Sequence, residues 1–223
     1  MIADVRFALR QIRRSPGFTA AAVITLGLGI GACTAAYSLV HGLLWRPLPF
    51  LEPDRIVILR GANPSRGITD AELSEADLRD LRQRARSVTI LAAIAPRQSA
   101  LGTPDGADRI TGQLADPGLF EILGVPAELG RVFRADEAAA DAPPVVVLSH
   151  GFWSRRFGRD SSIVGRTVTI NGTPTTVVGV MPASFQFFRG DIWRPLIPDP
   201  TVARDERGVI AIGRLSPGAS LGT

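Results

Sequence analysis

The chain of 223 residues carries 25 basic residues, and every one of them is an arginine. The absence of lysine excludes a G-x-x-x-x-G-K-[ST] phosphate-binding loop, a Schiff-base lysine and a protein kinase. Most of the net charge of +4 comes from the N-terminal segment, and the remainder mixes both signs without a basic cluster. This distribution argues against a nucleic-acid partner.

Residues 1–17 are expected to form a cytoplasmic amphipathic segment. Apolar residues recur there at helical spacing, and Arg6, Arg10, Arg13 and Arg14 lie between or directly after them. This pattern is typical of a helix that lies on an anionic inner leaflet, with a disordered basic tail as the alternative. Ser15-Pro16-Gly17 is expected to break this helix before the membrane span begins.

Residues 18–45 contain no charged side chain and predict a transmembrane helix. A helix of this length reaches about 42 Å, whereas a hydrocarbon core of about 30 Å needs roughly 20 apolar residues. Because the flanking arginines lie on one side, we expect a cytoplasmic N-terminus and an exported remainder. The protein is therefore expected to be single-pass.

Gly27, Gly31 and Ala35 form a row of small residues along one face of this predicted helix. Such rows let a second helix approach closely, and close packing holds helices together in lipid. The row therefore predicts a helix-packing face. A bare membrane anchor with incidental glycines is the alternative.

Two processing alternatives arise within the apolar run. Residues 30–33 resemble a loose lipoprotein cleavage box that ends at Cys33, and residues 34–36 fit an ordinary signal peptidase. The run continues to Trp45, which is longer than the 7–15 residues, roughly, of a signal-peptide core. A retained span is therefore favoured. Cys33 is the one cysteine of the chain, so the exported part contains no disulfide.

The exported part is expected to be an α+β domain, since short strands mix with short helices without a regular βαβ rhythm. Ser74 and Asp77 approximate a capping box, and Asn171-Gly172 predicts a tight hairpin turn. In chain order, the predicted elements are strand 55–60, helix 75–84, strands 99–102 and 109–113, helical turn 119–123, connector 135–144, strand 145–148, helix 151–157, strands 168–170 and 175–180, and strands 192–196 and 209–215.

A search for catalytic groups favours a protein that is not an enzyme. Ser149 and His150 are adjacent, and neighbouring residues on a strand point to opposite faces, which is poor geometry for a nucleophile and its base. Acidic residues 136, 137 and 141 are interpreted as a solvated loop, and aromatic residues 152, 153 and 157 as core packing. With two histidines and no H-E-x-x-H pattern, we predict no metal and no cofactor.

Ordered motifs along the chain resemble MacB/FtsX-type permeases, most closely the long duplicated permeases of acidobacteria. The membrane part contributes D-V-R-F-A-L-R-Q-I-R-R-S-P-G-F-T (4–19), T-L-G-L-G-I-G-A (25–32) and L-L-W-R-P-L-P-F (43–50). The following part resembles the family's periplasmic core domain through L-F-E-I-L-G-V (119–125), G-R-V-F (130–133), V-V-V-L-S-H-G-F-W-S-R-R-F-G (145–158), V-G-R-T-V-T-I-N-G (164–172) and V-V-G-V-M-P (177–182).

The resemblance implies a non-catalytic permease component in the bacterial inner membrane. A separate ATP-binding subunit would drive it, beside other permease helices or a second permease copy, and the periplasmic domain would relay the motion. Residues 46–223 would form this domain, with a porter-like lobe (46–117 and 206–223) and an inserted lobe (118–205). The family usually carries Asn where this chain has Cys33.

The family's further membrane helices would follow the last strand. Because the chain ends at Thr223, a truncated gene product, a fragment or half of a split permease is expected. The alternative function is a membrane-anchored or lipidated periplasmic binding module that works without an ATPase.

Overall fold

The computed structural model describes residues 16–44 and 50–219, which fall into two units. The first unit contains helix α2 (Pro16–Leu44), which confirms the predicted apolar helix. Its residues Pro16–Ser38 are long and apolar enough to cross a membrane, with a mean hydropathy of 1.8. Pro16 and Gly17 belong to this helix, where a proline in the first turn gives up no helical hydrogen bond, and the break expected before it concerns residues outside the described part of the chain. The predicted amphipathic helix lies outside the described residues.

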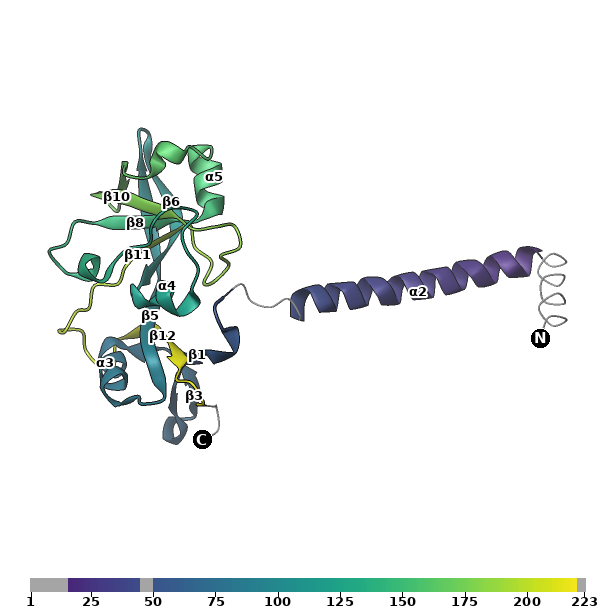
Figure 1. The fold of residues 1–223 in the computed structure, drawn as a ribbon, viewed down its shortest axis with the longest axis horizontal. Coiled ribbons are helices and arrows are strands. Elements are labelled where there is room, and N and C mark those ends of the chain that lie inside the picture. The colour runs from purple at the N-terminus through teal and green to yellow at the C-terminus, as the bar shows by residue number, and fades with distance from the viewer. Residues whose placement is uncertain (1–15, 45–49, 220–223) are drawn as a thin grey trace. The chain divides into compact units, whose positions relative to one another are not determined.

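The second unit is a mixed α+β domain built on a 10-stranded sheet (Figure 1), which confirms the predicted fold class. The main path of the sheet runs β1-β12-β5-β6-β11-β8-β10-β7, and β4 and β9 pair beside it. The strands are β1 (Ile56–Leu59), β4 (Leu73–Ser74), β5 (Val88–Thr103), β6 (Gly106–Ala115), β7 (Leu129–Gly130), β8 (Val145–Leu148), β9 (Thr167–Ile170), β10 (Thr173–Val180), β11 (Ile192–Pro195) and β12 (Arg207–Leu215), with a separate pair β2 (Gly61–Asn63) and β3 (Ile68–Ala71).

The α-helices of the domain are α3 (Glu75–Arg84), α4 (Gly118–Leu123) and α5 (His150–Phe157), close to their predicted bounds. Ser74 caps α3 through its Oγ, which accepts from the Asp77 amide, and the Asp77 carboxylate accepts from the Ser74 amide in return. The predicted capping box is therefore confirmed. Short 3₁₀ turns lie at Pro53–Arg55, Pro64–Arg66, Ala135–Ala138 and Ser161–Ile163.

Strands β9 and β10 form the predicted hairpin. Asn171 and Gly172 have φ of 51° and 79°, as the tight turn requires. By contrast, the two short strands expected at 99–102 and 109–113 belong to the long antiparallel pair β5 and β6. The first half of β5 was missed because residues 92–95 are buried on both faces, so no apolar–polar alternation marks them.

Long strands β5 and β6 connect the parts of the domain. Figure 1 shows α5, β8 and β10 toward one end of the domain and α3, β1 and β3 toward the other. Leu101 near the end of β5 and Ile110 in the middle of β6 belong to one apolar cluster with Phe152 and Trp153 of α5. Near the opposite end, Ala93 of β5 belongs to a separate apolar cluster, whose other buried members are Leu73, Leu78, Leu196, Val209 and Ala211.

Candidate functional site

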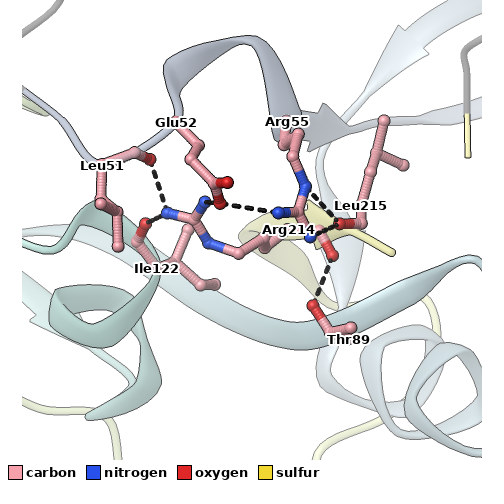
Figure 2. Close-up of polar contacts among 7 residues, drawn as sticks. All are labelled: Leu51, Glu52, Arg55, Thr89, Ile122, Arg214 and Leu215. Atoms are coloured by element: carbon pink, nitrogen blue, oxygen red, sulfur yellow. Dashed lines mark hydrogen bonds and ion pairs between the residues drawn. The ribbon is translucent and has the colours of Figure 1, made fainter. Parts of the chain in front are cut away.

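A buried arginine, Arg214, organises the place where the chain enters this domain and where its last strand ends (Figure 2). The residue lies near the end of β12 and is 7% exposed. Its guanidinium donates to Glu52 Oε2 at 3.0 Å, to the Leu51 carbonyl at 2.7 Å and to the Ile122 carbonyl. One side chain thus joins three segments that are remote in the sequence.

Glu52 and Arg55 extend this cluster along the entering segment. The Glu52 carboxylate also accepts from Arg55 Nη1 at 2.6 Å. Arg55 in turn donates from Nε and Nη2 to the Leu215 carbonyl, at 3.0 and 2.7 Å. Glu52 itself has a left-handed backbone conformation, with φ of 45°. A non-glycine residue in this conformation is strained, and the surrounding hydrogen bonds hold it there.

The entering segment also docks directly on helix α4. The Leu51 amide donates to the Leu123 carbonyl at 3.0 Å, which satisfies an acceptor at the end of the helix. Leu51 lies against Gly124, the αL residue that ends α4, and a Cβ added to Gly124 would come within 2.5 Å of the Leu51 Cβ. We call the set Leu51, Glu52, Arg55, Ile122 and Arg214 the entry cluster.

Aromatic and backbone contacts support the entry cluster from two sides. Phe50 packs edge-on against Phe187, with ring centroids 5.3 Å apart, and so joins the main apolar core. At the end of β12, Thr89 Oγ1 donates to the Arg214 carbonyl at 3.1 Å, and the Ser216 amide donates to the Ser87 carbonyl. The cluster therefore rests on the first residues of β5 as well.

A family profile that matches most of the sequence shows the family of this chain. The profile described as the MacB-like periplasmic core domain matches residues 19–222. The chain belongs to the MacB-like periplasmic core domain family. A search of curated protein sequences returned no match.

Solved structures show the same fold for the MacB-like domain. A permease-protein domain from Porphyromonas gingivalis has 19% identity and a TM-score of 0.56, and covers 77% of each chain. The periplasmic region of MacB from Actinobacillus actinomycetemcomitans has 17% identity and a TM-score of 0.56, covering 77% of this chain and 78% of that one. The extracellular domain of the ABC-type transporter YknZ from Gram-positive bacteria has 16% identity and a TM-score of 0.50, covering 72% and 81%.

Helix α2 of this MacB-like chain carries the predicted packing row Gly27, Gly31 and Ala35 on its exposed surface. A Cβ built at Gly27 or Gly31 meets nothing within 4 Å in the structure. The row is therefore open, and its role in packing stays a prediction. Arg6, Arg10, Arg13 and Arg14, which are predicted to set the topology, lie outside the described residues.

Ser149 and His150 have a structural position in the MacB-like fold. Ser149 is the N-cap of α5, and its Oγ accepts from the Phe152 amide at 3.1 Å, so the expectation that it lies on a strand is wrong. The His150 Nε2 lies 3.8 Å from Glu128 Oε2. Both residues line an open cavity of about 450 Å³. Among the described residues, no group of three His, Cys, Asp or Glu side chains is placed to hold a metal.

Two interpretations of polar and aromatic clusters have different outcomes. Phe152 and Trp153 are buried in the core and Phe157 packs against it, which confirms core packing.

Glu137, in contrast, is not a solvated loop residue. Its carboxylate is 10% exposed and binds Arg131 through two hydrogen bonds of 2.8 and 2.7 Å. These bonds hold the pKa of Glu137 below its ordinary value, together with the amide of Arg134.

Sequence reasoning missed the entry cluster. Arg214 follows a run of apolar strand residues, and an arginine in such a run is a signal, because its donors need acceptors when the strand is buried. The sequence alone does not show which acceptors bind Arg214, because Glu52 lies 162 residues away in the sequence.

Proposed function

We propose that this chain is a non-catalytic permease component of an ABC-type export or mechanotransmission system, and that its periplasmic domain relays motion driven by a separate ATPase. The entry cluster is the observation that carries this proposal. It fastens residues 50–52, which follow the membrane helix in the chain, to α4 and to the end of β12. A pull on residues 51 and 52 would therefore act on α4 and on the end of β12.

The proposed placement is the inner membrane, with a cytoplasmic segment 1–17, one span over 18–45 and a periplasmic domain over 46–223. The arginines before the span and the apolar length of α2 support this orientation. Within the domain we keep the two proposed lobes, 46–117 with 206–223, and 118–205. Because β6 pairs with β11, the boundary at residue 117 follows the chain and does not divide the sheet.

The proposed partners are a separate ATP-binding subunit and either other permease helices or a second permease copy. The absence of lysine supports a separate ATPase, since a phosphate-binding loop needs this residue. The exposed row Gly27, Gly31 and Ala35 supports a partner helix in the membrane, where small residues allow close approach.

Orientation is tested by fusing reporters to the full chain. A C-terminal reporter that is active only in the periplasm should be active, and one that is active only in the cytoplasm should be silent. The reverse result contradicts the proposed orientation and, with it, the proposed function.

Coupling is tested by electron paramagnetic resonance distances between labels on Cys33 and on Asp105→Cys. The chain is reconstituted with the ATP-binding subunit that cross-links to it. We expect the distance distribution to change on adding a non-hydrolysable ATP analogue, and Arg214→Met to reduce that change. An identical distribution with and without nucleotide contradicts a mechanical relay.

A further inference from the structure

The open cavity of about 450 Å³ lies where helix α5 begins. Ser149, which caps this helix, directly follows β8, and Pro182 and Ala183 of the cavity wall closely follow β10. Strands β8 and β10 are parallel, so the cavity lies at their shared carboxyl end. In sheets whose parallel strands lead into helices, ligands bind at this end.

Two arginines, Arg155 and Arg189, and one carboxylate, Asp191, line this cavity. The Asp191 carboxylate is already in use, since it accepts from Arg155 Nη2 at 2.8 Å and from the Thr111 amide at 3.0 Å. The exposed Arg189 guanidinium, in contrast, has no hydrogen-bond or ion-pair partner among the described residues. The cavity therefore has an excess of positive charge and a free cationic donor.

The first turn of α5, a helix of eight residues, adds backbone donors to the same cavity. The amides of His150 and Gly151 have no acceptor within the helix, because they precede its first hydrogen-bonded turn. Arg155 Nη1 lies 3.1 Å from the position that a Cβ on Gly151 would occupy. The Arg155 guanidinium thus extends over these amides, and an anion placed there would meet both kinds of donor.

A buried indole gives a second, independent sign of a ligand. Trp193 of β11 lines the cavity and is 1% exposed, and its Nε1 has no hydrogen-bond partner in the part of the chain that the structure describes. Buried indole N–H groups usually find an acceptor, because an unsatisfied donor is costly. This donor at the cavity wall therefore points to an acceptor from outside the chain.

The arrangement of the donors favours a phosphate group over a carboxylate. The donors come from separate parts of the fold, namely the start of α5, residue 189 and strand β11. A phosphate group presents three strong acceptor oxygens in different directions, whereas a carboxylate presents two in one plane. The volume also falls within the range of small-molecule sites, about 300–1,000 Å³, so an organic group attached to the phosphate has room.

We propose that this cavity binds a phosphate monoester, whose phosphate group is held by Arg155, Arg189 and the amides of His150 and Gly151. A soluble sugar or glycerol phosphate and the head group of an anionic lipid share this chemistry. The site is independent of the entry cluster and of the proposed coupling to an ATPase.

The test measures binding of glycerol 3-phosphate, glycerate and dioctanoyl phosphatidate to the full chain in a maltoside detergent and Tris chloride buffer, by ligand-observed nuclear magnetic resonance. Both phosphate esters should bind more tightly than glycerate, the carboxylate counterpart. Tighter binding of phosphatidate than of glycerol 3-phosphate identifies a lipid ligand, and the reverse order identifies a soluble one. Arg155→Gln and Arg189→Gln should each weaken binding of the preferred ester at least tenfold.

Arg156→Gln is the matched control, because Arg156 is the next residue of α5, pairs with Asp108 at 2.9 Å and does not line the cavity. It should leave binding unchanged. Arg189 is exposed, so its variant tests the site even if Arg155→Gln fails to fold. Equal affinity for the preferred ester in wild type and Arg189→Gln, tighter binding of glycerate than of both esters, or no binding of either ester overturns the proposal.

Discussion

Arg214 and Glu52, 162 residues apart in the sequence, form an ion pair of 3.0 Å. Arg214 also binds the Ile122 carbonyl of a third segment. The two side chains differ in burial, since the side chain of Arg214 is 8% exposed and that of Glu52 is 52% exposed. The hydrogen bonds of Arg214 to the two backbone carbonyls are therefore shielded from water. The Glu52 carboxylate stays open to solvent. The buried hydrogen bonds of Arg214 therefore contribute more to stability than the ion pair with Glu52.

Replacing Arg214 by methionine should lower the free energy of unfolding by about 2–4 kcal/mol, because two carbonyls and a carboxylate lose a charged donor. Denaturation of the full chain, followed by tryptophan fluorescence, measures this change. Arg155→Met is the control, since the Arg155–Asp191 pair is 2.8 Å long with Arg155 68% exposed, and an exposed pair contributes about 0–1 kcal/mol. Equal losses in both variants would contradict a special role for Arg214.

Gly124→Ala should destabilise the domain more than Gly158→Ala. Both glycines end helices in the left-handed region, with φ of 64° and 57°, so both variants carry backbone strain of about 1 kcal/mol. A Cβ at 124 also meets Leu51 at 2.5 Å, whereas a Cβ at 158 meets nothing within 4 Å. We expect thermal melting to separate the two variants. Indistinguishable melting curves would show that Leu51 moves aside without cost.

Glu137 should contribute to the free energy of unfolding at neutral pH, and this contribution should disappear in acid. Hydrogen bonds from Arg131 lower the pKa of Glu137 in the folded state, so its contribution is present above the unfolded-state pKa and is lost as the pH falls through the folded-state pKa. Urea denaturation of wild type and Glu137→Gln from about pH 7 to about pH 3 checks this. The difference in the free energy of unfolding between wild type and Glu137→Gln should shrink as the pH falls. A difference that stays constant with pH would contradict this prediction. Asp136→Asn, at a 71% exposed site, should leave the profile unchanged.

Gly27→Leu and Gly31→Leu should weaken association of helix α2 with a partner helix, because a bulky side chain separates the two backbones. Gly29→Leu is the control, since Gly29 lies on the other side of the helix, on the same face as Cys33. A fluorophore on Cys33 therefore reports proximity by energy transfer without covering the row. If all three variants retain the transfer efficiency of the wild type, the row is an anchor surface without a packing partner.

The purified full chain should have the mass of an unprocessed polypeptide. Helix α2 continues past Cys33 to Leu44, which is longer than a signal-peptide core. Intact-mass spectrometry of wild type and Cys33→Ser should give the same result apart from the substitution. A lipid-modified Cys33 at a new N-terminus would instead support the anchored binding module.

Local chemistry explains which parts of the fold were predictable. The capping box at Ser74 and the turn at Asn171-Gly172 depend on residues adjacent in the sequence, and both are confirmed. The predicted helix 75–84 has the observed bounds because its cap and its charges define it locally. The family motifs likewise predicted an α+β MacB-like domain, which the fold and the profile match bear out.

Features that depend on remote partners were not predictable in the same way. Four consecutive residues of β5, 92–95, are all buried, so the sequence there lacks the period of two that reveals a half-buried strand. The geometry of Ser149 and His150 was judged as that of strand residues, although the position of Ser149 before a helix is that of an N-cap. Glu137 was taken as solvated because its partner Arg131 lies across a turn whose shape the sequence does not specify.

The pairing of β1 with β12 places a constraint on how the chain matures. Synthesis proceeds from the N-terminus, so Glu52 exists long before Arg214 does. At about 5–20 residues per second, a gap of 162 residues corresponds to a wait of roughly 8–32 s. During this interval β1 presents an unpaired edge, and an early segment of the sheet is open to wrong partners. The sheet can therefore close over β1 only after β12 has been synthesised. Translation pauses or chaperones that act before residue 214 should change the yield of folded domain.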